Sequence, residues 1–193
     1  MRIREVVLPA ADPAAAAAFH PEAYGFTRVR FEPGPAVCSH FAVNVGQFDD
    51  AVAWARGQAE LIEEDVPFEA WRARAAYYFD PVGNLVELIA RERAPGNELL
   101  IEVSEVGLPV ADVGTAVGFL ETELDLPHFS GDRSRFSAVG DDHGLFILVP
   151  VGRDWLFTDR PASDAAVRVT IEGPGARELR VPGSDHAIEV ASN

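Results

Sequence analysis

An eight-residue segment that occurs twice is the feature that most constrains how this chain can fold. Residues 5–12 read Glu-Val-Val-Leu-Pro-Ala-Ala-Asp and residues 105–112 read Glu-Val-Gly-Leu-Pro-Val-Ala-Asp, so six of the eight positions are identical. Each copy is a short apolar run that ends in an aspartate, whose side chain can cap a following helix. The repeat therefore predicts an internal duplication, in which one strand–helix unit occurs in both halves of the chain.

The pattern of apolar residues predicts further strands and helices around the repeat. We expect helices over 13–23, 47–64 and 113–124, and strands over 39–45, 68–79, 85–91, 135–139, 145–149 and 166–171, with a final pair around Leu179 and Ile188. Strands that outnumber helices and are joined by short turns favour an α+β fold with curved mixed sheets. A polar segment containing Pro-Gly separates the halves, so we expect a first half over 1–92, a linker over 93–100 and a second half over 101–193.

Charge and cysteine content exclude some classes of function. The formal net charge is −15, from 31 acidic and 16 basic residues, and every basic side chain is an arginine. An acidic surface without a basic stripe argues against nucleic acid as a partner, although it would attract cationic ligands or a metal ion. Solubility alone accounts for the same composition. Cys38 is the single cysteine and no apolar run is long enough for a membrane span, so we expect a cytoplasmic protein with no membrane partner.

Two segments of the first half resemble a known family. Residues 39–45 read Ser-His-Phe-Ala-Val-Asn-Val, and residues 77–88 read Tyr-Tyr-Phe-Asp-Pro-Val-Gly-Asn-Leu-Val-Glu-Leu. Together with the repeated opening strand, they are similar to the vicinal oxygen chelate superfamily, which includes glyoxalases, extradiol dioxygenases and bleomycin resistance proteins. The resemblance implies tandem βαβββ modules that form curved sheets around a cup. Each half would contain one full and one short module.

The resemblance also implies a divalent metal site. Carried over by position, the ligands are Glu5, His40 and Glu87, with Glu32 as a weaker candidate for a fourth. One imidazole and two or three carboxylates suit Mn²⁺, Ni²⁺, Fe²⁺ or Zn²⁺. Glu87 is also the candidate catalytic residue, as a general base.

This sequence departs from the family pattern in its ligands. Family sites usually have two histidines, whereas Glu5 stands where a histidine is common. Glu105 and Glu189 fall at equivalent places in the second half, but no histidine matches His40 there, so we expect no metal in that half.

Each candidate residue has a more ordinary interpretation. His40 could be a hydrogen-bonded strand histidine, and Glu5 could be an exposed residue or an ion-pair partner of an arginine. Trp71 and Tyr77 have the same sequence parity and could share one face of a strand as a wall of a ligand pocket. Trp155 lies in an unusual loop of mixed apolar and charged residues. Aromatic residues in strands usually belong to the core, so all three substrate-binding assignments are hypotheses.

Two functions are consistent with these features. The first is a metal-dependent lyase, isomerase or dioxygenase that binds a small molecule in the cup, with His40, Glu87 and Glu5 holding the ion. The second is a metal-free small-molecule-binding protein of the bleomycin resistance type. The sequence identifies no substrate and is compatible with either a monomer or a homodimer.

Overall fold

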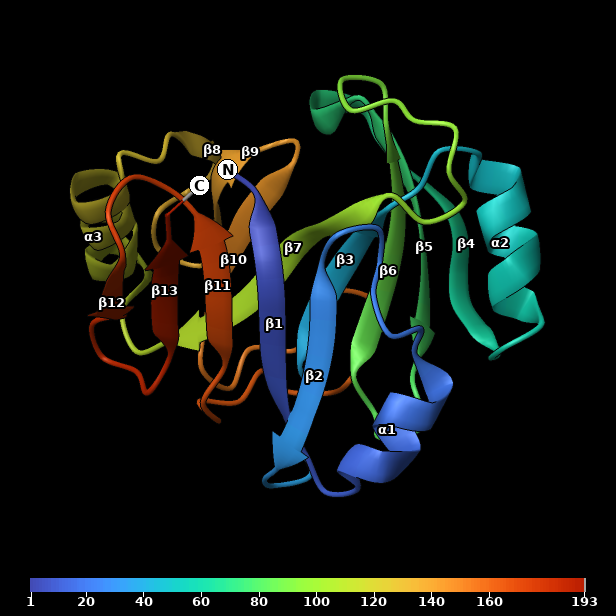
Figure 1. The fold of residues 1–193 in the computed structure, drawn as a ribbon, viewed down its shortest axis with the longest axis horizontal. Coiled ribbons are helices and arrows are strands. Elements are labelled where there is room, and N and C mark those ends of the chain that lie inside the picture. Colours follow the sequence, from blue (N-terminus) through green and yellow to red (C-terminus); the bar gives the residue numbers. More distant parts are fainter. Residues whose placement is uncertain (193) are drawn as a thin grey trace.

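The computed structural model describes residues 1–192, which form two mixed β-sheets and three α-helices (Figure 1). The five-stranded sheet has the order β12-β13-β11-β1-β2, and the eight-stranded sheet has the order β4-β5-β6-β3-β7-β10-β9-β8. The strands are β1 (Ile3–Ala10), β2 (Arg28–Pro33), β3 (His40–Asn44), β4 (Leu61–Phe68), β5 (Ala73–Phe79), β6 (Leu85–Arg91), β7 (Glu102–Val110), β8 (His128–Gly131), β9 (Ser137–Asp141), β10 (Gly144–Pro150), β11 (Arg168–Glu172), β12 (Arg177–Arg180) and β13 (Ala187–Ala191). The helices are α1 (Pro13–Phe19), α2 (Phe48–Arg56), α3 (Val113–Leu124) and a short 3₁₀ turn, η1 (Glu69–Trp71). This arrangement confirms the α+β fold with curved mixed sheets.

Each of the two sheets contains strands from both halves of the sequence. The eight-stranded sheet contains two full βαβββ modules, β3-α2-β4-β5-β6 and β7-α3-β8-β9-β10, joined by the antiparallel pair β3–β7. The five-stranded sheet combines β1 and β2 from the beginning of the chain with β11, β12 and β13 from its end. Residues 93–100 therefore connect two strands of the same sheet, β6 and β7.

Asp12 and Asp112 act as helix caps, as the repeat predicts. Their carboxylates accept hydrogen bonds from the backbone N–H groups of Ala15 and Thr115, at the starts of α1 and α3. Helix α3 has the expected bounds, whereas α1 ends at Phe19 instead of continuing to residue 23.

The helix expected over 47–64 is wrong in its second half. Helix α2 ends at Arg56, and Leu61–Phe68 forms the edge strand β4, which pairs with β5. Gly57 lies where the helix ends, and the pairing of β4 is irregular around Asp65, whose φ is 112°. Strand pairing with β5 thus outweighs the helical periodicity of the local sequence.

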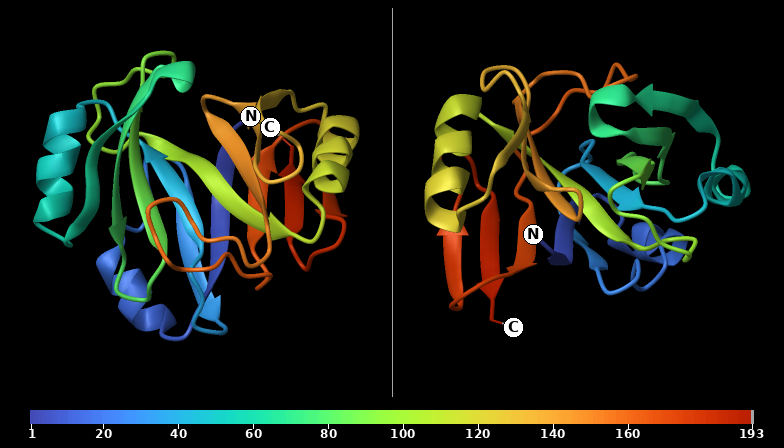
Figure 2. Two further views of the ribbon diagram at one scale, coloured as in Figure 1. Left: turned by 180° about the vertical axis from the view of Figure 1, so that it is seen from behind. Right: turned by 90° about the horizontal axis from the view of Figure 1, so that it is seen from above.

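A shared apolar core holds the two sheets together. Side chains from β1, such as Ile3, Val6 and Leu8, belong to the same buried cluster as Val106 and Leu108 of β7. The helices lie on the outside, with α2 against β4, β5 and β6 and α3 against β9 and β10 (Figure 2). The opposite face of the eight-stranded sheet is left to form a cup.

His186 joins the five-stranded sheet to β7 through two hydrogen bonds. The backbone N–H of Val167 donates to Nδ1 (3.1 Å), and Nε2–H donates to the carbonyl oxygen of Pro109 (2.7 Å). This pattern requires the neutral imidazole, because Nδ1 must accept a hydrogen bond. Burial lowers the pKa of His186 from its ordinary value of 6.5.

We predict that His186 makes the fold less stable in mild acid. Below the ordinary histidine pKa the unfolded chain takes up a proton that the folded chain does not, so stability falls as the pH falls. His186→Gln does not titrate and should reduce this dependence by at most about 1.4 kcal/mol per pH unit. Urea unfolding of both proteins between pH 7.5 and pH 5 tests this. Parallel stability curves for the two proteins would contradict it.

Candidate metal centre and ligand cavity

The turn between β5 and β6 positions two of the candidate site residues. Asp80 Oδ1 accepts hydrogen bonds from the backbone N–H groups of Val82 and Asn84, and Gly83 adopts a φ of 92°. The Asn84 side-chain oxygen in turn accepts from the backbone N–H of Ser39 (3.2 Å). The Asp-Pro-Val-Gly-Asn segment therefore fixes the start of β6 beside the start of β3, the two strands that carry Glu87 and His40.

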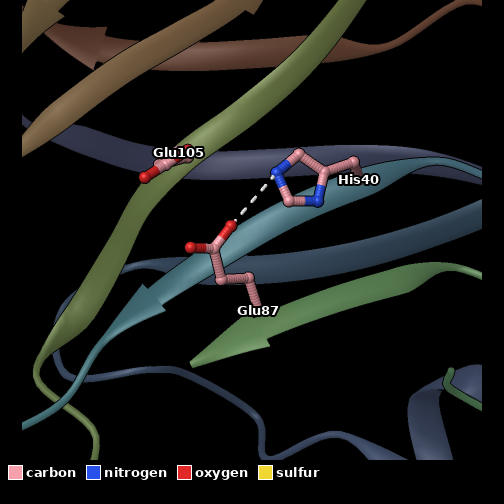
Figure 3. Close-up of side chains that lie close together, drawn as sticks. All are labelled: His40, Glu87 and Glu105. Atoms are coloured by element: carbon pink, nitrogen blue, oxygen red, sulfur yellow. Dashed lines mark ion pairs between the residues drawn. The ribbon is translucent and has the colours of Figure 1, made fainter. Parts of the chain in front are cut away.

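His40, Glu87 and Glu105 converge from three neighbouring strands of the eight-stranded sheet (Figure 3). One potential ligand atom from each residue lies within 4.8 Å of the others, and all three side chains are buried. His40 Nε2 is 3.7 Å from Glu87 Oε2. Glu105 enters from β7, beside β3. These three residues form a candidate metal site, since imidazole and carboxylate groups are common metal ligands in proteins.

Strand register shows how the two full modules contribute to this centre. His40 lies opposite Leu85 in the parallel pair β3–β6, and Glu105 lies opposite Leu145 in the parallel pair β7–β10. Glu87 and Ile147 each lie two residues further along the second strand of their pair. His40 thus corresponds to Glu105, and Glu87 to Ile147. The fourth equivalent position carries an apolar side chain, so these four positions offer at most three candidate ligands.

His40 presents a lone pair to the centre. Its Nδ1–H donates to the carbonyl oxygen of Leu85 (3.2 Å), which leaves Nε2 as the acceptor that faces Glu87. Burial lowers the pKa of His40 to about 4, against the opposing effect of the bond to Leu85. The imidazole is therefore neutral at physiological pH, the form that binds metal ions.

The two carboxylates share one counter-charge, Arg91. Arg91 is fully buried, donates from Nη2 to Glu105, and donates from Nε to Asn44 Oδ1 (3.2 Å). Burial, together with repulsion from Glu105, raises the pKa of Glu87 well above 4.5, against the opposing effects of Arg91 and Tyr77. Burial also raises the pKa of Glu105. Without an added cation, Glu87 is therefore biased toward holding a proton.

A cavity of about 220 Å³ opens above the cluster, and its walls are mainly apolar. It is lined by His40, Phe68, Trp71, Tyr77, Leu85, Glu87, Glu105, Phe136, Ile147, Val149, Arg153, Asp154, Trp155 and Leu156. The sheet curls until its two edges approach each other, since Trp71 Nε1–H donates to Ser130 Oγ of β8 (3.0 Å). An apolar cavity with a few polar groups at its base is typical of a small-molecule site.

Trp71, Tyr77 and Trp155 all line this cavity, although they come from three different segments. Trp71 belongs to η1 and not to the strand of Tyr77, so the parity argument does not explain their shared position. Trp155 lies in the segment after β10, where its Nε1–H donates to the carbonyl oxygen of Cys38 (2.8 Å). A Cβ atom at Gly107 would lie 2.6 Å from the Trp155 ring, so glycine leaves room for the indole.

Glu5 does not join His40 and Glu87, which corrects the expected grouping. It lies on β1 in the five-stranded sheet, opposite Thr170 of β11, and its nearest cation is Arg30 (3.8 Å). Glu32 lies on β2, opposite Pro9 of β1, and pairs with Arg168. The reason is topological, because the module that begins with β1 pairs with the last module of the chain and not with the module of His40.

The five-stranded sheet repeats the pattern of the His40, Glu87 and Glu105 cluster with different side chains. Glu5 and Glu189 take the places of Glu105 and Glu87, since Thr170 pairs with both of them as Ala42 does in the other sheet. The positions equivalent to His40 and Ile147 are Arg168 and Arg30. These arginines form ion pairs with neighbouring glutamates on an exposed face.

Two residues of the centre were missed as candidates from sequence. Glu105 opens the second copy of the repeat, so the repeat did identify its position, but not that β7 lies beside β3. Arg91 ends β6 in a run of charged residues, Arg91-Glu-Arg, and nothing in that run distinguishes a buried arginine from exposed ones.

The fold is shared with known structures. It is the glyoxalase/dioxygenase-like fold, and several solved structures with this fold match nearly the whole chain. A candidate dioxygenase from Bacillus subtilis superposes with a TM-score of 0.64 at 12% identity, covering 100% of this chain and 85% of the other. Glyoxalase I from Zea mays superposes with a TM-score of 0.56 at 15% identity, covering 98% and 91%, and a variant of it gives 0.61 at 14% identity, covering 99% and 93%.

These likenesses confirm the fold that the sequence motifs predicted. No protein-family model and no curated protein sequence matches the chain. Among the helices of residues 1–192, none has the length and apolar character needed to cross a membrane.

Proposed function

We propose that this protein is a divalent-metal-dependent enzyme of the lyase or isomerase type, acting on a small molecule bound in the cup. The observation that carries the proposal is the convergence of His40, Glu87 and Glu105 at the base of an apolar cavity. Glu87 is the proposed catalytic residue, and Trp71, Tyr77 and Trp155 are proposed ligand contacts.

The donor set fits a divalent cation. Two carboxylates and one guanidinium leave a net negative charge when both carboxylates are ionised, and a buried negative charge is costly unless a cation or a proton compensates it. One imidazole nitrogen and two carboxylate oxygens suit Mn²⁺, Ni²⁺, Fe²⁺ or Zn²⁺. An oxygenase is less well supported, because the usual iron site of oxygenases has two histidines and one carboxylate.

A cation held by these three residues would leave coordination positions for two adjacent substrate oxygens and would stabilise an enolate-like charge on the substrate. The residues of the chain supply the rest of the chemistry. Glu87 is the group proposed to accept and return a proton, because it lines the cavity and lies opposite Tyr77 in the β5–β6 pair. The apolar walls exclude water, which strengthens electrostatic interactions at the base of the cavity.

The test is metal binding by the untagged protein, with Glu87→Gln as the loss-of-site variant. At an ion concentration of about one hundred times Kd, the wild type should gain about 5–10 °C in Tm with at least one of the four ions. Glu87→Gln should lose most of this gain, because the amide cannot supply the negative charge. Glu189→Gln is the matched control, since Glu189 takes the equivalent place in the five-stranded sheet. Metal content by mass spectrometry gives the stoichiometry.

A metal-free binding protein is the second candidate function, and two observations favour it. Arg91 already compensates Glu105, and Ile147 stands at the fourth equivalent position. In that case no ion would shift the Tm of the wild type, and Glu87→Gln would bind small apolar ligands as the wild type does. An equal metal shift in the wild type and Glu87→Gln would reject the assignment of the site itself.

A further inference from the structure

The segment after β10 places exposed apolar side chains at the mouth of the cavity. Four large apolar residues are exposed within residues 1–192, and three of them, Val151, Leu156 and Phe157, lie in this segment. Leu156 is 46% exposed and also lines the cavity. Phe157 is 40% exposed, and its ring packs edge-on against Tyr77 of the cavity wall, with 5.2 Å between ring centroids. Isolated exposed apolar residues are common, but a pair at the mouth of a cavity indicates a contact surface.

Phe157 adopts a backbone conformation that aromatic residues rarely tolerate. Its φ is +63°, in the left-handed region. The Thr158 N–H donates to the carbonyl oxygen of Trp155 (3.1 Å), so Trp155–Thr158 form a turn with Phe157 at its third position. In such a turn, glycine or asparagine is the usual residue at that place. A strained residue whose ring is also half exposed costs stability, and such residues concentrate at ligand contacts.

The segment that carries these two residues is a fixed hairpin. Its strands are bonded to each other by Gly152 N–H to Ala162 O (2.8 Å), Ala162 N–H to Arg153 O (2.8 Å) and Trp155 N–H to Arg160 O (3.0 Å). Trp155 attaches it to the carbonyl oxygen of Cys38, and the Arg160 guanidinium lies 3.8 Å above the ring of Phe79. Leu156 and Phe157 are therefore held in place at the mouth before any ligand arrives.

From this geometry we infer that Leu156 and Phe157 are specificity-determining residues that form an apolar rim. The rim takes a hydrophobic extension of a ligand whose oxygen-bearing end lies at Glu87 and Glu105. The inference rests on the proposed function for the position of the oxygen end. It adds the class of ligand, a small molecule with one polar oxygen end and an apolar tail too long for the cavity alone. The cavity surface is mainly apolar, with Arg153 and Asp154 of the hairpin as its charged residues apart from the ionisable cluster at the base.

A series of alkyl hydroxamates tests the rim, because their two adjacent oxygens form a constant chelating end and their chains differ in length. We compare acetohydroxamate, hexanohydroxamate and octanohydroxamate on protein loaded with the ion that gives the largest thermal shift. Affinity should rise about twofold for each methylene that reaches the half-exposed rim, roughly half the effect of full burial. In the double variant Leu156→Ser/Phe157→Gly this increase should disappear, while the affinity for acetohydroxamate stays within about twofold of the wild type.

A second probe separates this inference from the proposed function. N-phenyl-1-naphthylamine is neutral and apolar and needs no metal, so its fluorescence reports the cavity and rim alone. The double variant should bind it at least about fivefold more weakly. One outcome is that hydroxamates bind neither protein while the double variant still binds naphthylamine more weakly. That result would reject the metal assignment and support the assignment of the rim. If the loss of naphthylamine binding and the change in chain-length dependence are both absent, the rim is rejected.

Stability and oligomeric state complete the test. Glycine adopts a positive φ without strain, so Phe157→Gly should keep or raise the Tm even though it loses ligand contacts. Val151→Ser is the matched control, because Val151 is exposed in the same segment but does not line the cavity, and its probe affinities should equal those of the wild type. If the wild type is a dimer that the double variant abolishes, the rim is instead a contact between two copies, and the ligand inference is rejected.

Discussion

Arg91→Met is expected to lower the free energy of unfolding by about 3–5 kcal/mol, the typical cost of removing one partner from a buried ion pair. The guanidinium is fully buried and donates to Glu105 and to Asn44, and it lies 5.3 Å from the centroid of the Trp71 ring. Methionine fills similar space but leaves two carboxylates in the cup without a cation. Urea unfolding of the metal-free protein measures the change.

The pH dependence of this loss has a definite sign. Burial raises the pKa values of Glu87 and Glu105 in the folded chain, and Arg91 opposes that rise for both. When folding raises the pKa of a carboxyl group, the folded state disfavours the ionised form of that group. The free energy of unfolding of the protein therefore falls as the pH rises. The difference in unfolding free energy between the wild type and Arg91→Met should therefore be larger at pH 8 than at pH 5.

Two further variants show whether the effect comes from uncompensated charge. The double variant Arg91→Met/Glu105→Gln removes one charge of each sign, so it should recover a large part of the lost stability. Arg72→Met is the control, because Arg72 pairs with Glu92 at the surface, and its loss should change stability by no more than about 1 kcal/mol. A stability of Arg91→Met within 1 kcal/mol of the wild type, or no recovery in the double variant, would contradict this account.

Local chemistry in the sequence predicted the parts of the fold that depend on neighbouring residues. The cap at Asp112 and the length of α3 follow from one aspartate and the apolar run after it. The Asp80–Asn84 turn follows from proline, glycine and short polar side chains at fixed offsets. Both features are local, so no knowledge of the tertiary structure was needed.

Module pairing depends on contacts between distant segments. The sequence therefore did not predict which glutamate joins His40 and Glu87. His40 and Glu87 were correctly placed in adjacent strands because both belong to one module. The third member of the cluster depends on which module lies beside them. Glu5 and Glu105 occupy the same position in the two copies of the repeat, so the repeat does not distinguish between them. Only the pairing of β3 with β7 selects Glu105. The same limit applies to α2 and β4, where pairing with β5 outweighed the helical pattern.

Trp155→Ala is expected to cost about 3–5 kcal/mol, as for other large aromatic residues removed from a core. Trp155 is 5% exposed, its ring centroid lies 5.2 Å from that of His40, and its indole N–H bonds to the carbonyl oxygen of Cys38. Trp155→Phe keeps most of the packing and loses only the hydrogen bond, so it should cost about 1–2 kcal/mol. Urea unfolding at neutral pH gives both values.

Trp155→Ala also distinguishes ligand binding at the rim from metal binding at the base of the cup. Trp155 attaches the hairpin that carries Leu156 and Phe157, so Trp155→Ala should weaken the binding of N-phenyl-1-naphthylamine even though both rim residues are still present. His40 is oriented by its own bond to Leu85, and Glu105 by Arg91, so the thermal shift with the metal ion should persist. A variant that keeps full naphthylamine affinity would show that Trp155 does not position the rim. A variant that loses the metal shift would show that the indole, and not the strand framework, holds His40 in place.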